Sequence, residues 1–187
     1  MKVDLLEIYD EYYSRVKIFI TRLVKDEWLA EDLIQETFIR VQKNYSSVRD
    51  LSKLSSWIFR IAHNLCRDHF RSQKKYNHEL VIVKSEKTSS DPFVELPGQI
   101  EFEQFQMGAC VQRQIDLLPE QQRIVLILYD LLGFKHAEIA EILEISKENA
   151  KVRLHRARKG LKSILEEKCT FELDKRNVLI CEPVKKK

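Results

Sequence analysis

The stretch HAEIAEILEISKENAKVRLHRARKGL, residues 136–161, holds two amphipathic helical patterns separated by a short connection. Its spacing predicts a short helix over about 136–143 and a second helix that opens after Ser146. The Ser146 hydroxyl is suited to accept a hydrogen bond from a backbone N–H in the first turn of that helix. Two helices joined this closely form a helix-turn-helix. The stretch therefore predicts an all-α fold for this part of the chain.

The second of these helices divides into an apolar stripe and a polar face. The stripe, which we expect to be buried, consists of Ala150, Leu154, Ala157, Leu161, Ile164 and Leu165. The opposite face carries Glu148, Asn149, Val152, His155, Arg156 and Lys159. From Lys147 to Lys162 there are seven Lys or Arg residues and one acid, a density that favours phosphate binding. Asn149 and Arg153 lie near the end that enters a major groove in such motifs. A solvated basic surface helix is the alternative.

Three further helical patterns occupy the first third of the chain, at about 3–24, 26–45 and 54–72. In the second of them the apolar stripe is Ala30, Ile34, Phe38, Val41 and Tyr45. Repeats of this kind predict a compact antiparallel helical unit. Asp32, Gln35, Glu36 and Ile39 lie opposite the stripe. An acidic face of this kind repels DNA and suits a protein partner, although an ordinary solvated face has the same pattern.

The third pattern combines aromatic residues with a local excess of positive charge. From Arg60 to Lys75 there are five Lys or Arg residues and one acid. Aromatic and basic side chains together suit single-stranded nucleic acid. We expect Trp57 to pack in the core, whereas Asn64, Arg67 and Arg71 are candidates for binding.

A metal site in the same helix is the competing interpretation. His63, Cys66 and His69 are residue types that bind zinc. Their spacing spreads them over about a third of the helix circumference, where three ligands converge poorly. We therefore expect no metal and no other cofactor. A metal-dependent hydrolase built on these residues with Asp68 remains the enzyme alternative.

The rest of the chain sets the domain organisation and the compartment. Residues 72–99 lack helical periodicity and predict a flexible linker, and helical pattern resumes at about 100–117. Pro119 is expected to open the next helix and Gly133 to end it in a left-handed conformation. The tail after residue 168 predicts a short hairpin, with Cys169 and Cys181 facing each other. No signal-peptide pattern and no apolar run of about 18 residues is present, so we expect no membrane insertion. Scattered cysteines favour the reduced cytoplasm.

Four segments occur in an order that resembles the bacterial sigma factors of the extracytoplasmic function group, in the sigma-70 family. They are AEDLIQETFIRV (30–41), SSWIFRIAHNLCRDHFR (55–71), LPEQQRIVLILYDLLGFKHAEIAEIL (118–143) and ISKENAKVRLHRARKGL (145–161). The resemblance implies two small helical domains, at 1–75 and 100–167, with a linker at 76–99 and a tail at 168–187. It implies that the chain is not an enzyme and directs transcription initiation at promoters.

The resemblance also assigns roles to individual residues. Those implied to dock on the clamp helices of the largest RNA polymerase subunit are Asp32, Gln35, Glu36 and Ile39. Those implied to bind and melt the −10 promoter element are Arg60, His63, Asn64, Arg67 and Arg71, with Asn64 receiving a flipped base. Those implied to read the −35 element are Lys147, Glu148, Asn149, Lys151, Val152, Arg153 and Arg156. The polymerase flap, promoter DNA as duplex and single strand, and an anti-sigma factor that holds the chain at the membrane complete the implied partners.

This chain departs from the family pattern around the helix-turn-helix. Lys135 replaces the usual small or capping residue, and Glu144 occupies a turn position that often carries Gly. KENAK, residues 147–151, replaces a run of Gly-Thr-Val type, which puts the −35 sequence in doubt. The non-sigma alternative is a regulator of the helix-turn-helix class that binds duplex DNA alone, without polymerase.

Overall fold

The computed structural model describes residues 5–48, 50–79, 111–173 and 179–183. Contacts divide the chain into two compact units, one of Met1–Ser89 with Ile127–Ala150 and one of Ser90–Leu126 with Lys151–Lys187. The predicted linker at 80–99 and the predicted helical residues 100–110 lie outside the described residues. Among the helices that are described, none is both long and apolar enough to cross a membrane.

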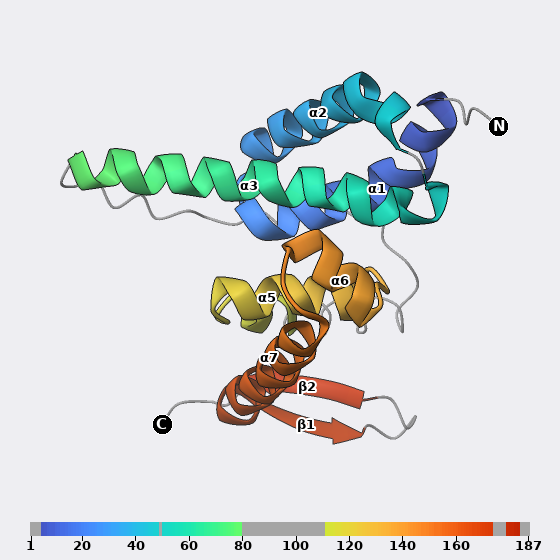
Figure 1. The fold of residues 1–187 in the computed structure, drawn as a ribbon. Helices are drawn as coiled ribbons and strands as arrows, with labels where there is room; N and C mark the ends of the chain where they lie inside the picture. Colours follow the sequence, from blue (N-terminus) through green and yellow to red (C-terminus); the bar gives the residue numbers. More distant parts are fainter. Residues whose placement is uncertain (1–4, 49, 80–110, 174–178, 184–187) are drawn as a thin grey trace. The chain divides into compact units, whose positions relative to one another are not determined.

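The N-terminal part of the first unit consists of α1 (Leu5–Val24), α2 (Glu27–Asn44) and α3 (Leu54–Glu79) (Figure 1). Between α1 and α2, Lys25 adopts a left-handed conformation with φ 56°. The Asp26 carboxylate then accepts a hydrogen bond from the Leu29 backbone N–H at 3.1 Å and caps α2. This sharp connection lets α2 return along α1, as the sequence predicted.

Helix α3 continues further than its apolar stripe. The short 3₁₀ turns η1 (Tyr45–Ser47) and η2 (Leu51–Lys53) precede it, and Asp50 caps η2 through the Ser52 backbone N–H. The helix runs to Glu79, so residues 76–79, which the sequence placed in the linker, are helical. Residues 72–79 contain no Gly or Pro and include Gln, Lys and Glu, which are good helix formers.

Aromatic residues from separate segments meet in the core of the first unit. Phe59 is fully buried, with its ring centroid 5.4 Å from that of Phe19 and 4.7 Å from that of Phe134. Arg15 lies over the Phe134 ring at 4.9 Å and donates to the Leu132 carbonyl. Trp57, by contrast, is only half-buried. The expectation that Trp57 packs in the core is wrong, because part of its side chain remains exposed.

The predicted helix-turn-helix is present. A π-helical turn, η3 (Ile127–Leu131), ends at Gly133 with φ 74°, and α6 (His136–Leu143) follows with the bounds the sequence predicted. The Lys135 side chain offers no acceptor, but the Lys135 backbone N–H donates to the Glu138 carboxylate at 2.7 Å. Glu144 adopts the left-handed conformation with φ 55° and ψ 46° and ends α6.

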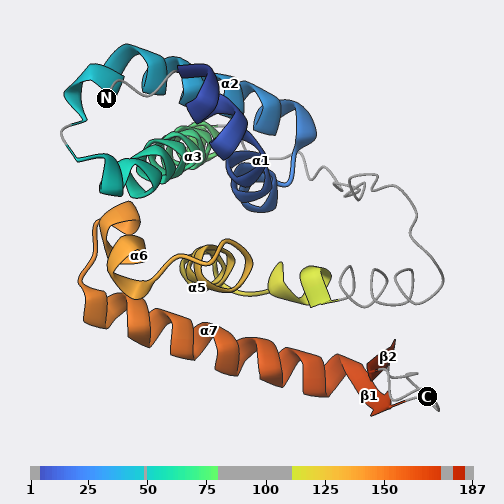
Figure 2. The same ribbon diagram turned by 90° about the vertical axis from the view of Figure 1, so that its right-hand side faces the viewer.

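Helix α7 (Lys147–Lys168) begins after Ser146, whose Oγ accepts from the Asn149 backbone N–H at 3.1 Å. It is continuous up to the C-terminal hairpin (Figure 2). Ala150, Leu154 and Ala157 are buried, as their stripe predicted.

The second unit packs α5 (Glu120–Leu126), the helical residues 111–115 and most of α7. Pro119 was predicted to be the first residue of the helix. It instead immediately precedes α5, and its carbonyl accepts a hydrogen bond from the Arg123 backbone N–H. The core holds Ile115, Leu118, Leu126 and Ala157. A Cβ added at Gly160 would lie 3.1 Å from Leu118 Cδ2, so a larger residue there would push Leu118 aside.

A two-stranded antiparallel hairpin of β1 (Cys169–Leu173) and β2 (Leu179–Pro183) confirms the predicted tail. Its turn at 174–178 lies outside the described residues. The backbone register pairs Cys181 with Phe171 and Cys169 with Pro183. The prediction that Cys169 and Cys181 face each other is therefore wrong, because the two are offset by two residues.

Candidate protein- and nucleic-acid-binding surfaces

The outward face of α2 carries the residues predicted to bind a protein. Asp32 and Gln35 are exposed, Glu36 is half-buried and Ile39 is 42% exposed. The opposite side of α2 is buried, and its one buried polar side chain, Thr37, donates its hydroxyl hydrogen bond to the Leu33 carbonyl at 2.7 Å. The inner side of α2 is therefore buried with its polar side chain hydrogen-bonded, and the outer side is acidic.

Two acids at the edges of this face are already paired within the chain. Glu36 accepts from Arg40 Nε at 2.8 Å, and Glu31 pairs with Lys17 Nζ of α1 at 3.1 Å. The hydrogen bond that the Lys17 ammonium donates to the Glu31 carboxylate raises the pKa of Lys17. Neither the Asp32 nor the Gln35 side chain makes a hydrogen bond or ion pair with any described residue. These two polar groups are available to a partner.

The basic face of α3 places four of its five predicted residues on one stripe. Arg60, Asn64, Arg67 and Arg71 follow the spacing i, i+4, i+7 and i+11. Arg60 and Asn64 are half-buried, whereas Arg67 and Arg71 are exposed. The stripe thus runs from a recessed end to an open end.

His63 lies beside this stripe and is largely removed from water. Burial, with a smaller contribution from the nearby Arg67 cation, lowers the pKa of His63 to about 4. His63 is therefore neutral near pH 7 and offers hydrogen bonds, not positive charge. His63 Nδ1 and Asn64 Oδ1 are both buried without a hydrogen-bond partner among the described residues. Two orphaned polar atoms on consecutive residues of α3 favour a ligand that supplies their hydrogen-bond partners.

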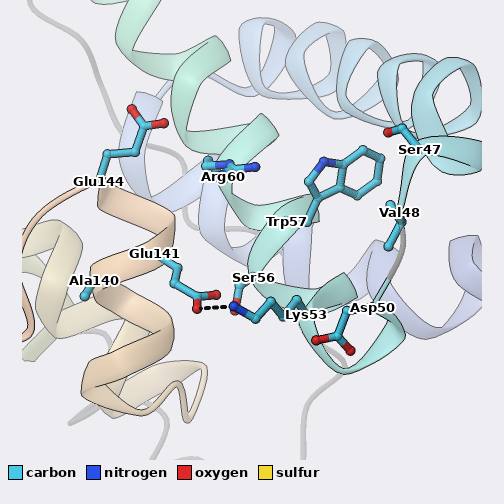
Figure 3. Close-up of a pocket in the computed structure, with 10 residues that line it drawn as sticks. All are labelled: Ser47, Val48, Asp50, Lys53, Ser56, Trp57, Arg60, Ala140, Glu141 and Glu144. Atoms are coloured by element: carbon cyan, nitrogen blue, oxygen red, sulfur yellow. Dashed lines mark hydrogen bonds and ion pairs between the residues drawn. The ribbon is translucent and has the colours of Figure 1, made fainter.

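A pocket of about 710 Å³ within the first unit adjoins the recessed end of the stripe (Figure 3). Trp57 and Arg60 of α3 line it together with residues of the α2–α3 connection and of α6. Lys53 on one side donates to Glu141 on the other at 2.9 Å (Figure 3). The lining residues from the connection are Ser47, Val48, Asp50 and Lys53.

Sequence reasoning missed this connection. Its residues have no helical periodicity and belong to two short 3₁₀ turns, so no pattern indicated which way they point. The available signal was Asp50 followed by Ser52, a local capping arrangement. The Ser52 hydroxyl and backbone N–H both donate to the Asp50 carboxylate and lower its pKa.

The basic face of α7 differs in being open along its length. Lys147, Asn149, Lys151 and Arg156 are exposed, as is Glu148, and Val152 is 46% exposed. Arg153 is half-buried and already takes part in an interaction within the chain. The positions predicted to enter a major groove thus lie at the capped N-terminal end of a solvent-facing helix.

The metal alternative finds no support in the geometry. Within the described part of the chain, no group of three His, Cys, Asp or Glu side chains is placed to hold a metal ion. Cys66 is buried on the core side of α3, while Asp68 is exposed. A hydrolase built on these residues would lack convergent ligands.

Comparison with known proteins identifies both halves of the chain. The family described as sigma-70 region 2 matches residues 8–76, and the one described as sigma-70 region 4 matches residues 108–161. The RNA polymerase sigma factor SigZ of Bacillus subtilis is 32% identical over 92% of this chain and 93% of its own length. The ECF RNA polymerase sigma factor SigM of the same organism is 34% identical over 88% of this chain and 95% of its own.

Solved structures share the fold. The sigma factor RpoE of Bartonella quintana, solved with the anti-sigma factor NepR, has a TM-score of 0.69 and 22% identity. The structural match covers 86% of this chain and 96% of the RpoE chain. CnrH, solved with the cytosolic domain of CnrY, has a TM-score of 0.60 and 20% identity, with 87% of each chain covered.

Proposed function

Because the chain belongs to the sigma-70 family, in its extracytoplasmic function group, we propose that its three charged helix faces make the separate contacts of promoter recognition. The chain is an alternative sigma factor, a protein that directs promoter recognition in transcription initiation. A factor of this class gives specificity to a polymerase, and we assign it no reaction of its own.

One observation carries the proposal: neighbouring helices of a single unit present opposite charge outward. The outer face of α2 is acidic and α3 has a basic stripe. A surface that bound only nucleic acid would gain nothing from an adjacent acidic face, since that face repels phosphate. If α2 binds a protein and α3 binds DNA, both the acidic face and the basic stripe are explained.

On α2 we assign Asp32, Gln35, Glu36 and Ile39 to contact with core RNA polymerase, at the clamp helices of its largest subunit. The Asp32 and Gln35 side chains make no hydrogen bond to any described residue, and Ile39 adds exposed apolar area. The flap is the second polymerase element that we expect the chain to contact.

On α3 we assign Arg60, Arg67 and Arg71 to the phosphates of the −10 strand, and Asn64 with His63 to a base. The orphaned Asn64 Oδ1 and His63 Nδ1 support this assignment, because a flipped base edge supplies hydrogen-bonding groups. A neutral His63 adds no charge, so the phosphate contacts depend on the arginines.

On α7 we assign recognition of the −35 duplex to Lys147, Glu148, Asn149, Lys151, Val152, Arg153 and Arg156. The Ser146 cap and the left-handed Glu144 turn support this role, since they set the start of the helix that enters the groove. Lys151 and Arg156 are suited to phosphates, and exposed Val152 to a thymine methyl group.

We propose domain boundaries at 1–75 and 100–167, with α3 extending to Glu79 into the connecting segment, and a tail at 168–187. The connecting segment would thread the RNA exit and active-site channels of polymerase. We propose that an anti-sigma factor masks the same surfaces. In support, RpoE was solved with the anti-sigma factor NepR, and CnrH was solved with the cytosolic domain of CnrY. We place the chain in the bacterial cytoplasm, held near the membrane when that factor is membrane-bound.

The test is run-off transcription with core RNA polymerase and this chain as the only sigma factor. We expect specific transcripts from a subset of genomic fragments. Failure to initiate on any fragment, with an active core shown by a second sigma factor, would overturn the assignment of polymerase-dependent function.

Variants separate the roles of α2 and α3. Asp32→Ala should weaken association with core polymerase, and Asp10→Ala, an exposed acid of α1, is the matched control. Asn64→Ala should impair strand opening, followed by permanganate reactivity, more than it impairs closed-complex formation. A helix-turn-helix regulator acting alone would instead bind duplex DNA tightly without polymerase and lose nothing on Asp32→Ala.

A further inference from the structure

Trp28 is the most exposed large apolar residue of the described chain, at 87%. It lies in the first turn of α2, two residues after the Asp26 cap. A single exposed apolar residue is ordinary on a protein surface. The significance of Trp28 therefore depends on what surrounds it.

Trp28 continues the outward stripe of α2. Trp28, Asp32, Gln35 and Ile39 follow the spacing i, i+4, i+7 and i+11, which places them on one side of the helix. At a rise of about 1.5 Å per residue the stripe is about 16 Å long. It has an aromatic residue at one end, an aliphatic residue at the other and two polar side chains between.

Within the described part of the chain, the stripe is exposed and its polar side-chain groups make no hydrogen bond or ion pair. The inner side of α2, including Ala30, Ile34 and Val41, is buried in the unit. Among the described residues, no hydrogen bond or ion pair engages Asp32, Gln35 or the Trp28 indole N–H. The flanking acids Glu31 and Glu36 are held by Lys17 and Arg40 instead. Local ion pairing thus flanks the stripe without occupying it.

We propose that Trp28 is an aromatic anchor of the polymerase-docking face and contacts a basic surface of core RNA polymerase. The inference rests on the proposed function of α2 and extends its docking face by one helical turn toward the N-terminus. A tryptophan ring offers a large apolar face that also attracts Arg and Lys side chains. The acids around it, Glu27, Glu31 and Asp32, favour a basic partner, and truncation of such aromatic anchors commonly dominates binding.

The experiment is competition of unlabelled full-length variants against the labelled wild-type chain for core RNA polymerase. We expect Trp28→Ala to bind at least about tenfold more weakly, and Trp28→Phe to lie between it and wild type. Ile18→Ala, which removes a 43% exposed apolar residue of α1, is the matched control and should bind like wild type. Because Trp28 is exposed, its variants should unfold at the same denaturant concentration as wild type.

Asp32→Ala separates this inference from the proposed function. If Asp32→Ala weakens binding while Trp28→Ala competes like wild type, the anchor is disproved and the docking face stands. If neither variant weakens binding, although the chain supports transcription, the docking face itself is disproved. If wild type sediments as a dimer that Trp28→Ala dissociates, the stripe joins two copies of the chain and the inference is overturned.

A second measurement reports on Trp28 directly. The chain has two tryptophans, so Trp57→Phe leaves Trp28 as the single site for 5-fluorotryptophan. On addition of core polymerase, the ¹⁹F resonance should lose its H₂O–D₂O solvent shift as the ring is covered. A resonance that keeps this shift in the complex would contradict the proposal.

Discussion

The two basic helices, α3 and α7, have similar charge but present it differently. On α3 the candidate readers Arg60, His63 and Asn64 are half-buried, and two of them hold orphaned polar atoms. On α7 the side chains from Lys147 to Lys151 project into solvent, apart from the buried Ala150. A recessed site suits a single base removed from its stack, whereas a projecting helix suits the groove of an intact duplex. The difference indicates that burial separates these two roles better than charge density does.

The largest expected effect concerns the recessed site of α3, where burial keeps His63 neutral. The pKa of His63 is about 4 when folded and 6.5 in its ordinary state, so the unfolded chain binds a proton first as pH falls. The stability contributed by neutral His63 is complete above about pH 6.5, declines between pH 6.5 and 4, and is lost below that range. The loss is up to about 3 kcal/mol.

Urea unfolding at pH 7 and pH 5 measures this effect. His63→Gln should lose less stability between the two pH values than wild type, because Gln does not titrate in this range. Equal losses for the two chains would show that His63 is not held neutral by burial.

Arg153 tests the projecting helix. Arg153→Ala should weaken binding of the polymerase complex to −35 duplex by about 1–3 kcal/mol, because a base contact and its charge are lost together. Arg153→Lys keeps the charge but loses the planar fork, so it should restore binding only in part. Lys159→Ala, an exposed cation later in α7, should have a smaller effect on sequence preference in the same gel-shift assay.

The start of α7 depends on its cap. Ser146→Ala removes the acceptor for the Asn149 backbone N–H and should lower the free energy of unfolding by about 1 kcal/mol. Ser146→Asp keeps an acceptor and should unfold like wild type. Thermal melts of the three chains decide this, and identical melting temperatures for Ser146→Ala and wild type would contradict the capping role.

The smallest expected change is a gain in stability at the turn before α7. Glu144 has φ 55°, which costs a side-chain-bearing residue energy that Gly does not pay. Glu144→Gly should raise the free energy of unfolding by about 0.5–1 kcal/mol, and Gly133→Ala, at φ 74°, should lower it by a similar amount. A melt in which Glu144→Gly is the less stable chain would show that the turn is not strained.

Local patterns predicted a large share of the fold. The bounds of α6, the Ser146 cap, the left-handed Gly133 and the hairpin all depend on neighbouring residues, and the structure has each of them. The two faces of α2 and of α7 also follow from periodicity. These features need only interactions within a helix, a turn or one strand pair, which the order of residues specifies directly.

Errors arose where a third element decided the outcome. Trp57 and Phe59 are two residues apart on an aromatic helix, and periodicity favoured Trp57 as the core residue. Phe59 is buried because Phe19 and Phe134, distant in the chain, close around it. The pocket lining at residues 47–53 likewise depends on packing between segments. The offset of Cys169 from Cys181, by contrast, is set by the register of the single strand pair.

The sequence by itself determined that this chain is helical, that α2 is acidic outward, that α3 and α7 are basic outward, and which family it belongs to. Only the tertiary structure decided that His63 is neutral, that Asn64 is recessed with an unused acceptor, and that Trp28 is left uncovered. The physical reason is that helical periodicity specifies which residues share a face. The desolvation of each residue depends on the segments that pack over that face, and these come from elsewhere in the chain.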